Sequence, residues 1–193
     1  MSRLILVAHA PTQALRRAVF GRDDDLDEGG TRAALALRDT VPNARGRWWC
    51  GPSRAAEQTA WALGAEPSVE PALADCAYGD WTGFSLDEIA GADPGAVRSW
   101  LSDPEATPHD GESLAALTRR VGAWLEAQAG ERGVAVVHPV VVRAALAHAL
   151  GLPPEAVWQL DVAPLAMVRL VHRSGRWRLH LTPLRPVPPA PID

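Results

Sequence analysis

The sequence predicts an α/β fold in which helices cover both faces of a mostly parallel sheet. Two short stretches, residues 3–8 and 134–137, are apolar almost throughout, which is typical of strands buried on both faces. Segments with helical spacing alternate with such strands along the chain. The chain has 193 residues, 47% of them hydrophobic, which suits one globular domain.

The first half of the chain is expected to contain two strands and two helices. A polar loop follows the first strand as far as residue 30, and a helix is expected over residues 31–40. Residues 47–51 form a second short strand. Ser53 is a suitable N-cap for a helix that runs to residue 63, because a serine hydroxyl accepts a backbone N–H of the first turn.

The second half begins with an irregular region over residues 66–84. Residues 113–129 carry apolar side chains at helical spacing, which predicts an amphipathic helix. The other expected elements are two short helices over 85–101, a loop over 103–111, a strand over 134–137, a helix over 140–150 that ends at Gly151, and strands over 165–172 and 177–181. Residues 1–182 are thus expected to form one domain, and the five prolines of residues 183–193 predict an extended tail.

Composition excludes several classes of function. Acidic residues outnumber basic ones by 23 to 19, the opposite of a duplex-binding domain, so no nucleic-acid partner is expected. Two cysteines without a Cys-x-x-Cys pair make neither a disulfide framework nor a zinc motif. The longest apolar region, residues 133–152, is interrupted by histidine, proline and arginine, so no membrane span is expected. A cytoplasmic protein is the expectation.

Two histidines follow buried strands directly. His9 comes after the first strand, and His138 comes after the strand over residues 134–137, just before a helix. Ligands of open parallel sheets bind at the carboxyl ends of the strands, so these two side chains are expected to face each other there. The alternative for either histidine alone is a half-buried side chain with a purely structural role.

Such a pair is suited to phosphoryl transfer. A neutral imidazole is a nucleophile toward phosphorus, and a protonated one donates to the phosphoryl oxygens, on which charge develops. Arg54 lies in the first turn of the helix capped by Ser53, where a cation is unfavourable unless an anion is near. This placement favours a phosphate ligand, although an exposed helix cation is the simpler explanation.

A leaving alcohol also needs a proton donor. Asp75 is the candidate, with Asp80 and Glu88 as competitors. A carboxyl group donates a proton at neutral pH only if burial or a neighbouring carboxylate raises its pKa. The alternative for any single loop aspartate is a turn or cap.

Five segments between residues 3 and 150, taken in order, resemble motifs of the histidine phosphatase superfamily, in its phosphoglycerate-mutase-like branch. They are Leu-Ile-Leu-Val-Ala-His-Ala-Pro-Thr at 4–12, Gly-Pro-Ser-Arg-Ala-Ala-Glu-Gln-Thr-Ala at 51–60, Asp-Cys-Ala-Tyr-Gly-Asp-Trp-Thr-Gly at 75–83, Gly-Glu-Ser at 111–113, and Val-His-Pro-Val-Val-Val-Arg at 137–143. The resemblance implies a three-layer α/β/α sandwich. It also implies that no metal or other cofactor is required.

The resemblance also assigns roles. His9 would become the phosphohistidine, Arg54 and His138 would bind the phosphoryl group, and Asp75 would be the proton donor. Two further residues, Thr12 and Arg22, match family positions near the pocket.

Three positions depart from the family pattern. Ala8 stands where the family has arginine, Pro139 stands where a glycine offers its backbone N–H, and Asp75 replaces glutamate. Losing one preorganised donor costs about 100- to 1,000-fold, so two losses approach roughly 10⁴ to 10⁶. Another arginine would have to fill the space, and those nearest in sequence are Arg16, Arg17 and Arg22.

The sequence therefore predicts phosphomonoester hydrolysis on a small phosphorylated metabolite through phospho-His9, weakened by Ala8 and Pro139. The alternative is an inactive relative that binds a ligand or a protein partner. A third hypothesis, a metal site from His9, Asp75, Cys76 and His138, has no support from local spacing. The tryptophan-rich surface is compatible with a homodimer. Aromatic side chains such as Trp100 would either stack on a ring-bearing substrate or pack in the core.

Overall fold

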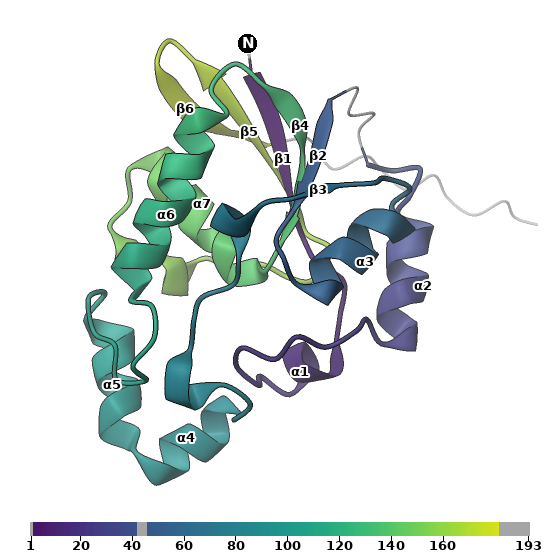
Figure 1. The fold of residues 1–193 in the computed structure, drawn as a ribbon. Helices are drawn as coiled ribbons and strands as arrows, with labels where there is room; N and C mark the ends of the chain where they lie inside the picture. The colour runs from purple at the N-terminus through teal and green to yellow at the C-terminus, as the bar shows by residue number, and fades with distance from the viewer. Residues whose placement is uncertain (1, 42–45, 182–193) are drawn as a thin grey trace, which may run out of the picture.

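The computed structural model describes residues 2–41 and 46–181, so the proposed tail over residues 183–193 lies outside the described part (Figure 1). Six strands form one sheet in the order β3-β2-β4-β1-β5-β6. The strands are β1 (Ser2–Ala8), β2 (Arg47–Cys50), β3 (Ser68–Val69), β4 (Arg132–Val137), β5 (Met167–Arg173) and β6 (Arg176–His180). The pairs from β3 to β1 are parallel, whereas β5 and β6 join antiparallel. The mostly parallel sheet is thereby confirmed.

Seven α-helices in the described residues connect and cover these strands. They are α1 (Gln13–Arg16), α2 (Glu28–Ala36), α3 (Arg54–Ala62), α4 (Leu86–Ala92), α5 (Pro94–Ser102), α6 (Leu114–Ala127) and α7 (Pro139–Leu150). Short 3₁₀ helices occupy Pro71–Leu73, Gly79–Trp81 and Pro154–Gln159. None of the helices in residues 2–41 and 46–181 has both the length and the apolar composition that a membrane span requires.

The sheet is the middle of three layers. Helices α2 and α3 lie on one side of it and α6 and α7 on the other (Figure 1). Side chains of β1 alternate between the two faces: Leu4 and Leu6 belong to the core cluster that contains α6 and α7, while Ile5 and Val7 pack in the cluster with α3. Both faces of β1 are therefore buried, which explains its continuously apolar sequence.

Helix α2 begins three residues before the expected position. The Asp27 side chain caps it by accepting the N–H of Gly30 at 2.6 Å. A Cβ on Gly30 would lie 2.3 Å from the carbonyl oxygen of Pro11, so glycine allows the helix to pack against the segment that follows His9. The two adjacent glycines thus serve close packing, although in sequence they are typical of a loop.

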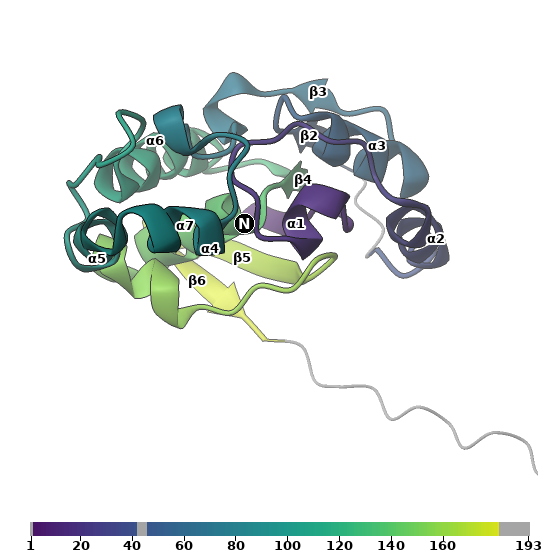
Figure 2. The same cartoon turned by 90° about the horizontal axis from the view of Figure 1, so that it is seen from below.

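The carboxyl ends of β1 and β4 finish side by side, because these strands pair in parallel with Ala8 opposite Val137. Figure 2 views the molecule from this end, with α1 on one side of the strand ends and α4 and α5 on the other. The residues that follow both strands therefore enter the same space.

Candidate active site

The two histidines that follow β1 and β4 meet. The backbone N–H of His9 donates to the carbonyl oxygen of Val137 at 2.9 Å, and His138 is the N-cap residue of α7. Nε2 of His9 lies 3.2 Å from Nδ1 of His138, and the ring centroids are 4.5 Å apart. Residues 129 positions apart in sequence thus share one site.

A backbone carbonyl fixes the tautomer of His9. Nδ1 lies 2.7 Å from the carbonyl oxygen of Ala10, and since a carbonyl only accepts, Nδ1 carries the proton. Nε2 therefore presents its lone pair toward His138. Burial, reinforced by the nearby His138, lowers the pKa of His9 to about 4, so the ring is neutral at pH 7. A buried, neutral, oriented imidazole meets the requirements of a nucleophile.

Asp75 completes the cluster. Its Oδ2 lies 3.3 Å from Nδ1 of His138, and its Oδ1 accepts the N–H of Cys76 at 2.8 Å. Burial raises the pKa of Asp75 to about 7, so near neutrality the carboxyl group both donates and accepts a proton. Of the two competing carboxyls, Asp80 is exposed, and Glu88 closes a capping box with Ser85 that lowers its pKa.

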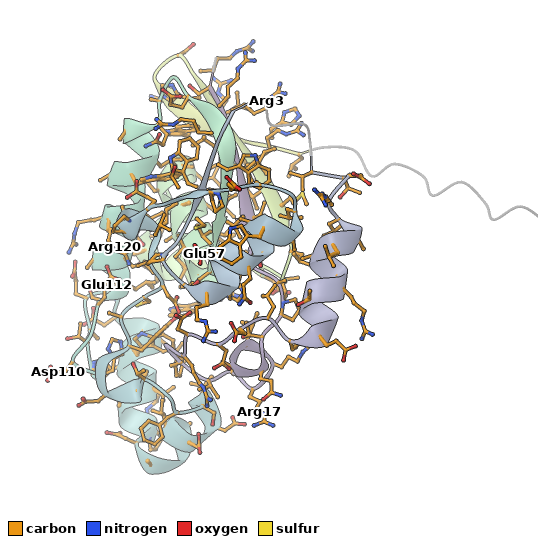
Figure 3. The ribbon with its side chains drawn as sticks, turned by 45° about the vertical axis from the view of Figure 1, so that its right-hand side comes forward. Arg3, Arg17, Glu57, Asp110, Glu112 and Arg120 are labelled. Atoms are coloured by element: carbon orange, nitrogen blue, oxygen red, sulfur yellow. The ribbon has the colours of Figure 1, made fainter. Side chains whose placement is uncertain are left out.

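A half-buried arginine holds the segment that carries Asp75. Arg120 of α6 donates to the carbonyl oxygens of Ala72, Ala74 and Asp75 at 2.9 to 3.2 Å. The Glu112 carboxylate accepts two further hydrogen bonds from the same guanidinium, at 2.6 and 2.9 Å. Figure 3 shows Arg120 and Glu112 next to each other along this side of the molecule. Five donated bonds from one rigid group therefore fix the backbone on which Asp75 sits.

A pocket of about 380 Å³ opens beside the three catalytic candidates. Thr12 and Arg22 both line it, as does Asp23. Thr12 is buried, and its hydroxyl caps α1 by accepting the N–H of Leu15 at 3.1 Å. Arg22 is paired with Asp24 at 2.8 Å. The N-terminal segment therefore forms one wall of the pocket.

Arg54 does not line this pocket. Its guanidinium pairs with the Asp25 carboxylate at 2.7 Å, and its backbone N–H donates to Oδ1 of Asp23 at 2.7 Å. The negative charges at the N-terminus of α3 are therefore the carboxylates of Asp23 and Asp25. The acidic loop thus folds back over this helix end, and the expected role of Arg54 in binding the phosphoryl group stays a prediction.

Of the three arginines nearest to Ala8 in sequence, one reaches the pocket. Arg22 lines it and pairs with Asp24. Arg16 pairs with Asp27 at 2.5 Å, Arg17 is exposed, and neither of them lines the pocket. A further cation, Arg143, lines the pocket from α7, and its Nε is buried without a partner among the described residues.

A sequence signal for Arg143 existed. Arg143 lies four residues after Pro139, on the same face of the helix. Because helical side chains point back toward the N-terminus, this spacing directs Arg143 toward the start of α7. Pro139 is the first residue of α7 and has no N–H, so Val140 carries the first backbone donor of this helix. Nε2 of His138 is buried and has no partner in residues 2–41 and 46–181.

The described residues contain no group of three or more histidine, cysteine or acidic side chains arranged to hold a metal ion. Sγ of Cys76 donates to the carbonyl oxygen of Glu112 at 3.4 Å, and burial raises the pKa of this thiol to about 12. A protonated thiol is a poor metal ligand, so this geometry gives the metal hypothesis no support.

Comparison with known proteins supports the same family. A profile of the histidine phosphatase superfamily (branch 1) matches residues 4–183. The glucosyl-3-phosphoglycerate phosphatase of Mycolicibacterium vanbaalenii is 30% identical over 78% of this chain and 75% of its own length. Phosphoserine phosphatase 1 of Hydrogenobacter thermophilus is 27% identical over 91% of this chain and 90% of its own.

Solved structures agree on the architecture. A mycobacterial glucosyl-3-phosphoglycerate phosphatase in complex with VO3 superimposes with a TM-score of 0.82 at 26% identity, covering 93% of this chain and 97% of that one. The phosphoserine phosphatase of Entamoeba histolytica gives a TM-score of 0.83 at 18% identity, over 93% and 95% of the two chains. The α/β/α sandwich, the ordered motifs and the profile match together show that this chain belongs to branch 1 of the histidine phosphatase superfamily.

Proposed function

We propose that this protein hydrolyses the phosphate ester of a small metabolite through a phosphohistidine at His9. The observation that carries the proposal is the orientation of His9, whose Nδ1 proton is donated to Ala10 and whose Nε2 lone pair faces the site. The phosphatase names of the relatives support the same reaction class.

In the first half of the reaction, Nε2 of His9 forms a bond to phosphorus while the bond between phosphorus and the ester oxygen breaks. Asp75 transfers its proton to the leaving oxygen, so the product is a neutral alcohol. His138 lies beside both groups. Burial lowers its pKa to about 4, so the ring is neutral at pH 7 and donates to a phosphoryl oxygen through its single N–H.

In the second half, a water oxygen forms a bond to phosphorus while the bond to Nε2 breaks. The Asp75 carboxylate, left without its proton by the first half, accepts a proton from this water. Inorganic phosphate leaves, and His9 returns to its neutral form. The pKa of about 7 suits both roles, because the carboxyl group must lose and regain one proton per turnover.

The test is to trap the intermediate. Wild-type protein mixed with a ³²P-labelled phosphomonoester and quenched in alkali, which preserves phosphohistidine, should retain label on the peptide that contains His9. His9→Ala should abolish labelling and turnover, whereas the exposed His180→Ala should change neither. Absence of both turnover and vanadate binding in the wild type would instead favour the inactive relative suggested by Ala8, Pro139 and the paired Arg54.

Three further expectations stay predictions of the same proposal. The protein is expected to act in the cytoplasm and to have no nucleic-acid partner. A homodimer is the expected assembly if the chain associates, and size-exclusion chromatography with light scattering measures its oligomeric state.

A further inference from the structure

Part of the pocket lining is aromatic. Phe20, Tyr78, Trp100 and Trp158 line the pocket from four separate segments of the chain. Their rings form a chain of contacts. The ring centroids lie 4.7 Å apart for Phe20 and Tyr78, 5.6 Å apart for Phe20 and Trp100, and 4.5 Å apart for Trp100 and Trp158. We call these four side chains the aromatic wall. Leu15 and Val162 extend its apolar surface.

Few charged groups reach this pocket. Besides the histidines, its charged lining residues are Arg22, Arg143, Asp23 and Asp75. The two arginines would match the two charges of a phosphoryl dianion, and Arg22 already pairs with Asp24. A second anionic group on the substrate, such as a carboxylate, would have no further cation among the described lining residues and would face the aromatic wall.

The size of the pocket limits the ligand. Its volume of about 380 Å³ is near the lower end of the roughly 300–1,000 Å³ of small-molecule sites. A phosphate that carries one or two rings fits this volume.

We propose that the group esterified to phosphate is a flat, uncharged, ring-bearing alcohol that packs against the aromatic wall. The proposal rests on the phosphomonoesterase activity proposed above and specifies its substrate class. Ring faces and edges of the wall contribute apolar area and offset or edge-to-face contacts, which a small polar alcohol cannot make.

The test compares three primary alkyl esters, whose leaving alcohols have similar acidity. They are 2-(1-naphthyl)ethyl phosphate, 2-hydroxyethyl phosphate and O-phosphoserine. The expected kcat/KM for the naphthyl ester is at least about a hundredfold above that of the other two, because burying a ring system outweighs the loss of a hydroxyl contact. Trp158→Ala should remove at least about tenfold of this preference, through a higher KM for the naphthyl ester.

The matched control is Trp61→Ala, since Trp61 is 53% exposed on α3 and does not line the pocket. Circular dichroism and thermal melting show whether a variant is folded, and if Trp158→Ala is not, the wild-type preference alone decides. Equal or higher kcat/KM on hydroxyethyl phosphate or phosphoserine would overturn the substrate class while leaving phosphomonoester hydrolysis intact. Failure to hydrolyse any of the three esters, with no label at His9, would overturn the proposed function as well.

Discussion

Replacing Asp75 by asparagine removes the proposed proton donor while keeping the shape of the side chain and an oxygen for the N–H of Cys76. The effect should depend on the leaving group. An alkyl ester such as 2-hydroxyethyl phosphate leaves as a strongly basic alkoxide, so its kcat/KM should fall by about 10² to 10⁴. 4-Nitrophenyl phosphate leaves as a weakly basic phenolate and should lose less than about tenfold.

The pH profile gives a second, independent magnitude. Because His9 must be neutral and its pKa is lowered to about 4, kcat/KM of the wild type should fall as the pH drops below 4. Because Asp75 must be protonated and its pKa is raised to about 7, kcat/KM should fall about tenfold for each pH unit above 7. Asp75→Asn should lack the alkaline limb only.

The assay is kcat/KM against pH for both esters, expressed as the ratio of variant to wild type so that ionisation of the substrate cancels. Asp80→Asn is the control, since this exposed carboxyl should leave both limbs unchanged. An alkaline limb that persists in Asp75→Asn on the alkyl ester, or an equal loss on both esters, would refute the assignment of Asp75 as the acid.

Three other predictions follow from single contacts. Arg120→Gln should lower kcat on alkyl esters at least tenfold and destabilise the fold by roughly 2 kcal/mol, a fall in Tm of about 4–8 °C, because Glu112 and three carbonyls lose a shared donor. The control is Arg119→Gln, which breaks the neighbouring exposed pair with Glu105, and equal effects of the two substitutions would contradict the prediction. Arg143→Met should weaken vanadate inhibition about tenfold, measured as Ki, whereas Arg17→Met should not; unchanged inhibition would remove Arg143 from the phosphate site. Asp25→Asn should free the Arg54 guanidinium and strengthen vanadate binding by up to about fivefold by calorimetry, and an unaltered Kd would show that Arg54 stays away from the ligand.

Local signals in the sequence predicted the elements that deliver the histidines. The apolar runs of β1 and β4 are unmistakable because both faces of these strands are buried. The Ser53 hydroxyl caps α3 by accepting the N–H of Ala56, so this helix start follows from one residue and its spacing. Such features depend on neighbours within a few residues.

Long-range features of the site were beyond these signals. The pairing of Asp25 with Arg54 spans 29 positions and results from the path of a loop, which no local periodicity encodes. The raised pKa of Asp75 comes from burial by several elements and is likewise a property of the assembled fold. The position of Arg143 is the exception, because its spacing of four residues from Pro139 places it near the start of α7.

The carbonyl of Ala10 makes the orientation of the His9 ring independent of the neighbouring side chains. Because a main-chain oxygen accepts the Nδ1 proton, side-chain substitutions around the ring leave its protonation pattern in place. Ala8→Arg and Pro139→Gly would therefore add one charge and one backbone N–H around a ring that is already oriented.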